Sequence, residues 1–356
     1  MRRGLLALPL AAAAIPAHAA TRPPRDAALA EWEYFKTSFL RPEGRVVDNY
    51  NGGVSHSEGQ GFTMLMAVRF DEPETFATLL RWTRATLSRP DDHLLAWCHR
   101  PGEAPRPSDR NNATDGDLFV AWALAEAADK WGQPNYRALS VAMCRDILGK
   151  LVVQSGDRSV LLPGIMGFRE RDTLVVNPSY YIYPAFNALR RVHASPAWSS
   201  LETSGLRLAR SARFGRWGLV PDWVAMSGSM PGRPGIAPGR APRFSYDAVR
   251  VPLYLAWGGF GSEPLVEAAS RFWHDPSLPR MPAWADLRTD EIAPYAADPG
   301  IAGVAWLSAR ASGQAQPGRS ADAARPPYYY SSALRLLSRL AMTDMAEARR
   351  QVVAAR

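Results

Sequence analysis

The sequence predicts an all-α fold in which about twelve helices of moderate length pair and close on themselves as an α/α toroid. Two observations support this prediction. Apolar side chains recur at helical spacing along most of the chain, and signals for strands are few and short. An even number of helices without a sizeable sheet favours paired helices, although periodicity by itself does not show that a ring closes.

The expected helices are marked by apolar stripes and by proline-containing starts. Clear stripes cover 29–39, 76–87 and 136–147. Asn177-Pro178, Ser195-Pro196 and Ser262-Glu263-Pro264 each resemble an N-cap followed by proline in the first turn. Short strands, expected as hairpin pieces in loops, are predicted at 159–164, 172–176 and 217–224.

The N-terminus carries the features of a secretory signal. Residues 1–19 contain Arg2 and Arg3, an apolar run, Pro16 and the small-residue pattern Ala17-His18-Ala19. The competing interpretation, a first buried helix, fits Pro16 and the small residues less well. We therefore expect cleavage near Ala19-Ala20, and a mature chain of 20–356 that is a single domain and is periplasmic or secreted. No later stretch is long and apolar enough to predict a membrane span in the mature chain.

Charge and cysteine content exclude several classes. The formal net charge of +8 becomes +8 − 2 = +6 without Arg2 and Arg3, and the remaining arginines are scattered, so we predict no nucleic-acid partner. Cys98 and Cys144 leave a disulfide open, since two cysteines do not make a framework. The six histidines lack metal-ligand spacing, and we predict no metal and no cofactor. The loop 226–243, rich in Gly, Pro and Arg, is interpreted as a cleft wall in preference to a domain boundary.

Three carboxylates at helix starts are the candidates for chemistry. Glu58 lies in "SEGQGFTMLMAV", Asp115 in "NNATDGDLFVAWAL" and Asp247 in "RFSYDAVRV", with Thr114 and Ser245 expected as caps. Each acid taken singly is also explained by the positive end of a helix, which is worth roughly 0.3–1 kcal/mol. Three of them in an exported chain with 12 Trp and 12 Tyr favour a shared cleft for carbohydrate.

The first of these acids presents a conflict. A helix N-terminus lowers the pKa of a carboxyl, whereas a general acid needs a raised pKa. If Glu58 is such an acid, burial and a neighbouring carboxylate must outweigh the helix dipole, and Asp115 is the expected neighbour. Gly59 and Gly61 fit this arrangement because they let a substrate or another chain segment approach closely.

These residues resemble glycoside hydrolase family 8. The resemblance is carried, in the family's order, by "SEGQGFTMLMAV", "ATDGDLFVAWAL", "NPSYY", "PDWV" and "SYDAVRV". It covers the chain from about Trp32 to Leu340 and implies a single (α/α)6 barrel with short β-hairpins in its loops. The single domain behind a signal is similar to the periplasmic endoglucanases encoded with bacterial cellulose synthase.

The resemblance also implies roles for individual residues. Glu58 matches the general acid that protonates the leaving oxygen. Asp247 matches the general base that activates water, which places the chain among the members that use an Asp there. Asp115 matches the residue that binds and helps to distort the sugar. Tyr180 and Arg250 match groups that hold the water and the base, and Arg250 lies three residues after Asp247 on one helix face.

Several aromatic residues are expected in the cleft. Trp97 resembles a sugar-stacking tryptophan, and Tyr246, Tyr329 and Tyr330 are expected to contact substrate, with Tyr328 in the same cluster. For these rings a place in the core is an equally good interpretation. The signature position often held by Tyr is Phe62 here, and 275–327 matches no family block that we identify.

The expected activity is that of an inverting endo-β-1,4-glucanase acting on β-1,4-glucan chains in cellulose biosynthesis, with the cellulose synthase complex as a possible partner. Inversion requires two carboxyls separated by roughly 6.5–9.5 Å so that a water fits between base and sugar. Two alternatives remain open. One is the same fold acting on xylan, chitosan or mixed-linkage glucan, and the other is a non-catalytic glycan-binding accessory of cellulose export.

Overall fold

The computed structural model describes residues 24–105, 107–229, 232–314 and 325–354, so the predicted signal 1–19 lies outside the described residues. Within these ranges the chain forms eleven α-helices, one short 3-10 helix and ten short strands, against the expected twelve or so helices. The helices are α1 (Pro24–Phe39), α2 (Ser57–Arg69), α3 (Pro73–Leu87), α4 (Thr114–Trp131), α5 (Pro134–Lys150), η1 (Pro178–Tyr180), α6 (Tyr183–Val192), α7 (Pro196–Ser211), α8 (Arg250–Trp257), α9 (Pro264–Trp273), α10 (Pro299–Ala311) and α11 (Tyr329–Ala354).

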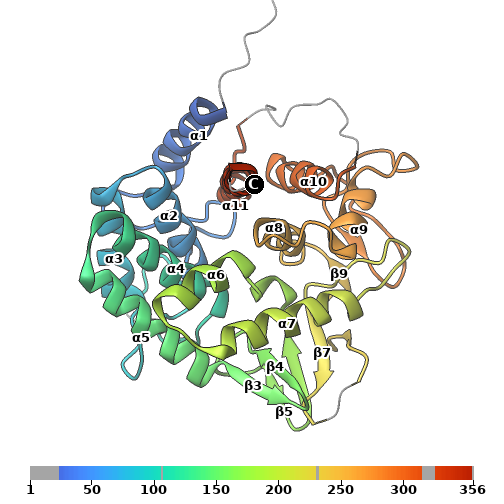
Figure 1. The fold of residues 1–356 in the computed structure, drawn as a ribbon, viewed down its shortest axis with the longest axis horizontal. Coiled ribbons are helices and arrows are strands. Elements are labelled where there is room, and N and C mark those ends of the chain that lie inside the picture. Colours follow the sequence, from blue (N-terminus) through green and yellow to red (C-terminus); the bar gives the residue numbers. More distant parts are fainter. Residues whose placement is uncertain (1–23, 106, 230–231, 315–324, 355–356) are drawn as a thin grey trace, which may run out of the picture.

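The helices form a closed ring. Helix α2 packs on α4, α4 on α6 and α6 on α8, and α8 then meets α11, which returns to α1 and α2. Helices α3, α5, α7 and α9 pack on the outside of this series, while α10 lies against α8, α9 and α11 (Figure 1). The all-α prediction and the paired arrangement are therefore confirmed, and the contact of α11 with α2 supplies the closure that periodicity did not show.

Burial distinguishes the inner helices from the outer ones. In α4 the side chains from Leu118 to Leu124 are all buried, as expected for a helix surrounded by other helices. In α3 only one stripe is buried, and it includes Phe76, Leu79, Thr83 and Leu87 at the spacing of one helix face. A helix that is buried on all sides thus lines the ring, whereas a helix that buries one stripe covers the outside of it.

Antiparallel strands occupy the loops. The four-stranded sheet has the order β5-β6-β7-β8, and β6 pairs with β7 so that Val176 lies opposite Val224. The strands predicted at 159–164 and 172–176 are confirmed as β4 and β6, whereas 217–224 contains only a bridge at Leu219 and the first residue of β7. The strands are β1 (Ser55–His56), β2 (Cys98–His99), β3 (Val152–Ser155), β4 (Arg158–Leu161), β5 (Arg169–Glu170), β6 (Thr173–Val176), β7 (Val224–Ser227), β8 (Gly235–Ile236), β9 (Arg243–Phe244) and β10 (Ala285–Asp286).

Proline marks the helix starts more reliably than the predicted caps do. Asn177 and Ser195 accept hydrogen bonds from the backbone of η1 and α7 as expected. Helix α9 does begin at Pro264, but its N-cap Glu263 makes no capping hydrogen bond. Thr114 does not cap α4, because it is already inside the helix and its hydroxyl donates to the Leu162 carbonyl at 2.7 Å.

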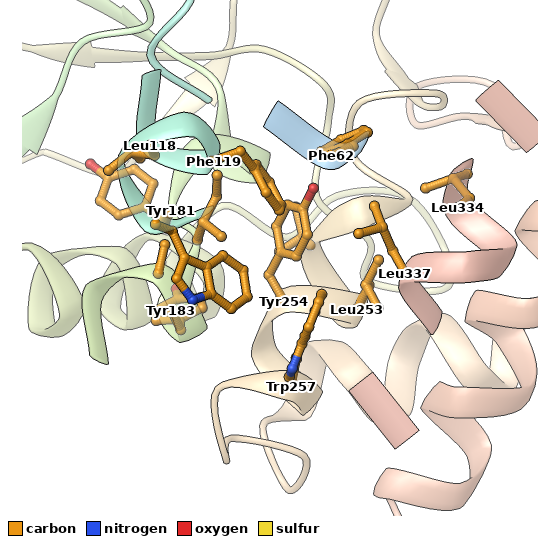
Figure 2. Packing of buried hydrophobic residues seen from close by; sticks show 14 of the residues in the cluster. Phe62, Leu118, Phe119, Tyr181, Tyr183, Leu253, Tyr254, Trp257, Leu334 and Leu337 are labelled. Atoms are coloured by element: carbon orange, nitrogen blue, oxygen red, sulfur yellow. The ribbon is translucent and has the colours of Figure 1, made fainter. Parts of the chain in front are cut away.

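Aromatic side chains fill the middle of the ring. Figure 2 shows Phe62, Phe119, Tyr254 and Trp257 among the leucines of α8 and α11. The rings of Phe62 and Phe119 lie 4.6 Å apart at 85°, the edge-to-face arrangement that aromatic pairs favour. Phe62, where the family signature often has Tyr, is fully buried here.

Two further observations concern the described residues. Cys98 and Cys144 are both buried, free thiols, so they are not paired. None of the described helices combines the length and the apolar character needed to cross a lipid bilayer.

Candidate active site

The three predicted carboxylates meet at one end of the ring. Glu58 lies in the first turn of α2, and Asp115 lies in the first turn of α4, which packs on α2. Asp247 lies in the turn that leads into α8, and Arg250 is the first residue of that helix. Three helix N-termini therefore bring together residues that are far apart in the sequence.

Arg250 joins the carboxylates directly. Its side chain is 4% exposed, and it donates to Glu58 through one terminal nitrogen. Its other terminal nitrogen donates to Asp247 at 2.9 Å and to Asp115 at 3.3 Å. The pairing with Asp247 was expected, but the contacts with the other two acids show that one buried guanidinium contacts all three carboxyls of the cluster.

The three carboxylates differ in their access to solvent. The Asp115 side chain is 3% exposed, the Glu58 side chain 15% and the Asp247 side chain 29%. Asp247 is therefore the acid of the cluster that water reaches most easily.

The pKa values of Asp115 and Glu58 are shifted in opposite directions. Burial raises the pKa of Asp115 well above its ordinary value, and the negative charge of Glu58 raises it further. Burial also raises the pKa of Glu58, but the charge of Arg250 and a hydrogen bond from Asp115 outweigh it, so the net direction is downward. The expectation that burial and Asp115 together raise the pKa of Glu58 is thus wrong for the free protein, because it omitted the contact with Arg250.

Asp247 and Tyr180 respond to the same environment. Burial raises the pKa of Asp247, Arg250 opposes this, and the net direction is upward. Burial and the charges of Asp115 and Asp247 raise the pKa of Tyr180 well above its ordinary value. Tyr180 therefore keeps its hydroxyl proton beside the carboxylates and can donate a hydrogen bond.

Two residues of the predicted "NPSYY" block support the cluster and were not identified from the sequence. The Ser179 hydroxyl accepts a hydrogen bond from Arg250 at 3.0 Å and donates to the Asn177 side-chain oxygen at 2.7 Å. Both residues are fully buried, and Asn177 lowers the pKa of Asp247. Asn177 had been explained by its place as an N-cap before Pro178, so its hydrogen bond to Asp247 was not anticipated.

Asp222, in the "PDWV" block, is a further residue that was missed. One oxygen of its carboxyl accepts hydrogen bonds from the backbone N–H groups of Ser245 at 3.0 Å and Ala248 at 2.8 Å. These two groups flank Asp247. The sequence predicted Asp247 in the first turn of a helix, but it lies in the turn before α8. Asp222, and not a capping Ser245 side chain, thus holds the turn that presents Asp247.

Comparison with known proteins agrees with this geometry. The model of glycosyl hydrolases family 8 matches residues 5–344. The chain belongs to this family. It is therefore a glycoside hydrolase with the (α/α)6 barrel of family 8.

Individual relatives cover most of the chain. A probable endoglucanase of Novacetimonas hansenii is 38% identical over 322 residues, which are 90% of this chain and 93% of the relative. An endoglucanase of Cellulomonas uda is 41% identical over 276 residues, 76% of this chain and 75% of the relative. Among solved structures, the endo-β-1,4-glucanase CMCax of Acetobacter xylinum superposes with a TM-score of 0.84 at 37% identity, covering 91% of this chain and 100% of that one.

Glycines allow close packing beneath the carboxylates of this family 8 hydrolase. A Cβ on Gly59 would lie 2.5 Å from the Tyr329 hydroxyl, and one on Gly61 would lie 2.6 Å from Phe119. The expectation that these glycines admit a close neighbour is confirmed, and the neighbours are segments of the same chain. Gly116 extends the pattern, since its Cβ would lie 2.7 Å from the backbone nitrogen of Glu58.

The predicted aromatic residues of the hydrolase divide into open and buried rings. Trp97 is partly exposed beside the start of α2, and its indole N–H donates to Asp109 at 2.7 Å. Tyr246 is 41% exposed, and Tyr330 is partly buried and donates its hydroxyl to the Tyr246 carbonyl. Tyr329 is only 2% exposed, so its ring belongs to the core and is not open for stacking on a sugar.

The loop 226–243 contains β8, which pairs with Val224 and Ala225 of β7, and residues 230–231 lie outside the described residues. Arg240 of this loop lies over the Trp223 ring at 4.7 Å, and Trp223 is 6.4 Å from the ring of Tyr180. The loop therefore lies near the site, and its function as a cleft wall stays a prediction. Among the described side chains, no group of three or more His, Cys, Asp and Glu is arranged to hold a metal ion.

Proposed function

We propose that this protein is an endo-β-1,4-glucanase that cleaves cellulose-type chains with inversion of configuration. The observation that carries the proposal is the arrangement of three carboxyls around Arg250, of which Asp247 is the most open to water. The names of the relatives, endoglucanase and endo-β-1,4-glucanase, support the substrate class.

Glu58 is the general acid in this proposal. A proton is available one hydrogen bond away on Asp115, whose pKa is raised by burial. A sugar in the site excludes water from Glu58 and offers its hydroxyl groups to Asp115, and both changes favour transfer of the proton to Glu58. Glu58 then gives the proton to the leaving glycosidic oxygen. Asp115 thus has two functions, to bind the sugar and to hold the proton before the reaction.

Asp247 is the general base. It is the acid that water reaches most easily, and Arg250 orients it through a 2.9 Å hydrogen bond. A water held by Asp247 and Tyr180 attacks the anomeric carbon on the face opposite the leaving group, and the proton of that water passes to Asp247. Attack from the opposite face inverts the configuration of the sugar.

We extend the proposal to the location of the enzyme. The N-terminal signal features support export, followed by action in the periplasm or outside the cell on glucan delivered by cellulose synthase. N-terminal sequencing of the protein recovered from the periplasm and the medium tests this, with a start at Ala20 expected. A start at Met1 in the cytoplasmic fraction would contradict it.

The roles are tested on carboxymethylcellulose by measuring released reducing ends. Glu58→Gln and Asp247→Asn should each lower kcat by about 10²–10⁴-fold while the circular dichroism spectrum stays that of the wild type. Glu267→Gln serves as control, because this carboxylate is 51% exposed and pairs only with Arg271 among the bonds seen in the described residues. Near-normal activity of either active-site variant would remove that residue from its role.

Product analysis separates the alternatives. NMR of the first anomer formed should show the α-anomer from a β-glucan, and a β-anomer would refute inversion. Faster release of reducing ends from xylan, chitosan or mixed-linkage glucan than from a cellulose derivative would assign that other glycan as the substrate. Binding of glucan without any release of reducing ends would instead support a glycan-binding accessory.

A further inference from the structure

A buried carboxyl that the proposed mechanism does not use lies two residues after Asp115. Asp117, in the first turn of α4, is fully buried. Burial raises the pKa of Asp117 to about 7, although hydrogen bonds from the Asn112 side chain and the Leu95 backbone lower it in part. An acid is rarely kept in a protein core unless its oxygens are hydrogen-bonded. The partners of Asp117 therefore indicate what this carboxyl is for.

Asp117 is the middle of a chain of three hydrogen bonds. Its Oδ1 accepts from the Leu95 N–H at 2.9 Å, and its Oδ2 accepts from the Asn112 side-chain amide at 2.8 Å. The side-chain oxygen of Asn112 accepts in turn from the Ile165 N–H at 2.8 Å. Asn112 is also buried, so a sugar reaches neither side chain. The two residues can act only through the segments that they hold.

One end of the chain holds the loop 95–97 beside the start of α2. The Trp97 carbonyl in this loop accepts from the Ser57 N–H at 2.9 Å. Ser57 is the first residue of α2 and immediately precedes Glu58. The hydrogen bond to Asp117 therefore fixes a loop that borders the predicted general acid.

The other end of the chain holds the loop 163–166 beside the start of α4. The first carbonyl of this loop accepts from the Thr114 N–H at 2.9 Å, immediately before Asp115. The side chains of Ile165 and Met166 are exposed, so the loop presents an apolar surface to solvent next to this helix start. The two loops thus flank the carboxyls from different sides of the chain of hydrogen bonds.

This chain of hydrogen bonds restrains what the glycine packing does not. Gly61 and Gly116 allow α2 and α4 to pack closely, and that packing holds the carboxyls without help from the chain. The loops 95–97 and 163–166 belong to no helix, so their positions depend on hydrogen bonds. A loop that is held before the substrate arrives loses less conformational entropy on binding. The chain should therefore act on KM and leave kcat nearly unchanged.

We propose that Asn112 and Asp117 are positioning residues that hold the loops 95–97 and 163–166 in the arrangement to which the glucan chain binds. The proposal rests on the proposed glucanase function. Both residues lie beside Asp115 in the sequence, yet neither was among the site residues expected from the motifs or from the family resemblance.

The test exchanges the two side chains. Asp117→Asn alone breaks the chain, because an amide has one acceptor oxygen and its nitrogen then faces one of the two N–H donors. Asn112→Asp together with Asp117→Asn keeps all three bonds: the carboxylate at 112 accepts from the Ile165 N–H and from the amide at 117, whose oxygen accepts from the Leu95 N–H. On cellohexaose, the single variant should raise KM by about tenfold with kcat within about threefold of the wild type. The double variant should return KM to within about threefold of the wild-type value.

Two further variants accompany the exchange. Asn112→Ala releases the loop 163–166 while the bond between Leu95 and Asp117 remains, so it should also raise KM, and it serves in place of Asp117→Asn if that variant does not fold. Glu126→Gln is the matched control. Its largely buried carboxyl accepts hydrogen bonds from Trp122 and Arg69, and it lies about 14 Å further along α4 at the helical rise of about 1.5 Å per residue. It should leave both KM and kcat within about twofold of the wild type.

The outcomes separate the two proposals. A wild-type protein that releases no sugar from cellohexaose refutes the proposed function. With an active wild type, a double variant that keeps the raised KM or does not fold refutes the positioning role alone, because its three hydrogen bonds are retained. An equal rise in KM for Glu126→Gln also refutes it, since a general loss of stability would then explain the result.

A loss confined to kcat likewise refutes the positioning role, because the loops would then not be what changed. Calorimetric binding of cellohexaose to Glu58→Gln with and without Asp117→Asn checks the result without turnover. We expect Kd to rise by about tenfold when Asp117→Asn is added, and equal Kd values would refute the proposal.

Discussion

Replacing Asp222 by Asn should make the protein more stable at alkaline pH. Burial, followed by the negative charge of Asp247, raises the pKa of Asp222 from an ordinary 3.8 to about 7. The folded protein therefore binds this proton more tightly than the unfolded chain does. The stability that the proton provides is present at low pH and is lost as the pH rises through about 7. Asn keeps an oxygen for the N–H groups of Ser245 and Ala248 and never ionises.

The size of the effect follows from the shift. The pKa of Asp222 differs by about 3 units between the folded and the unfolded protein. This corresponds to about 4 kcal/mol as an upper limit, since one pKa unit is worth a little over 1 kcal/mol. Part of the difference is already present at pH 5, because the unfolded chain has lost the proton there. Between about pH 5 and pH 8 we therefore expect the stability of Asp222→Asn relative to the wild type to increase by about 2–3 kcal/mol.

Urea denaturation followed by tryptophan fluorescence at several pH values measures this change. Asp157→Asn is the control, because its carboxylate is 65% exposed and a surface pair of this kind contributes little. Its stability relative to the wild type should stay within about 0.5 kcal/mol throughout. A stability difference for Asp222→Asn that does not change with pH would refute the reasoning, because it would mean that Asp222 is ionised in the folded protein at every pH tested.

Two further predictions concern the same end of the ring. Arg250→Met leaves Glu58 without its counter-charge and should cost about 3–5 kcal/mol at neutral pH. The stability supplied by the lowered pKa of Glu58 is fully present above the ordinary value of 4.5 and is lost as the pH falls below that value through the folded pKa, so the cost should shrink only below pH 4.5. A cost below about 1 kcal/mol at neutral pH, measured by urea denaturation, would contradict this prediction. Gly116→Ala places a methyl group 2.2 Å from the Ser57 hydroxyl oxygen, so α2 and α4 must separate. It should cost about 1–3 kcal/mol and lower activity on carboxymethylcellulose, and wild-type values for both would show that the helices yield without moving Glu58.

The sequence predicted the helices and the acids well because both depend on local patterns. Apolar periodicity identified α3 and α5, and the placement of Glu58 and Asp115 at helix starts follows from neighbouring residues alone. Arg250 was paired with Asp247 for the same reason, since three residues on a helix span a contact.

The missed features depend on contacts between distant segments. Arg250 meets Glu58 across 192 positions of sequence, and no spacing rule predicts that contact or its effect on the Glu58 proton. Asp222 acts through the backbone of residues 23 and 26 positions away. Tyr329 was ambiguous because an aromatic residue at a helix start suits both a core and a cleft, and only the packing of α1 and Gly59 around it decides.

The glycine contacts beneath the carboxylates have a consequence for engineering. Gly61 and Gly116 let α2 and α4 pack so closely that the distance between Glu58 and Asp115 can change only if whole helices shift. The loops that join the helices are free of this constraint. Directed evolution of the enzyme should therefore alter substrate preference through many loop positions, while substitutions of Gly61 or Gly116 that speed the chemical step should be rare.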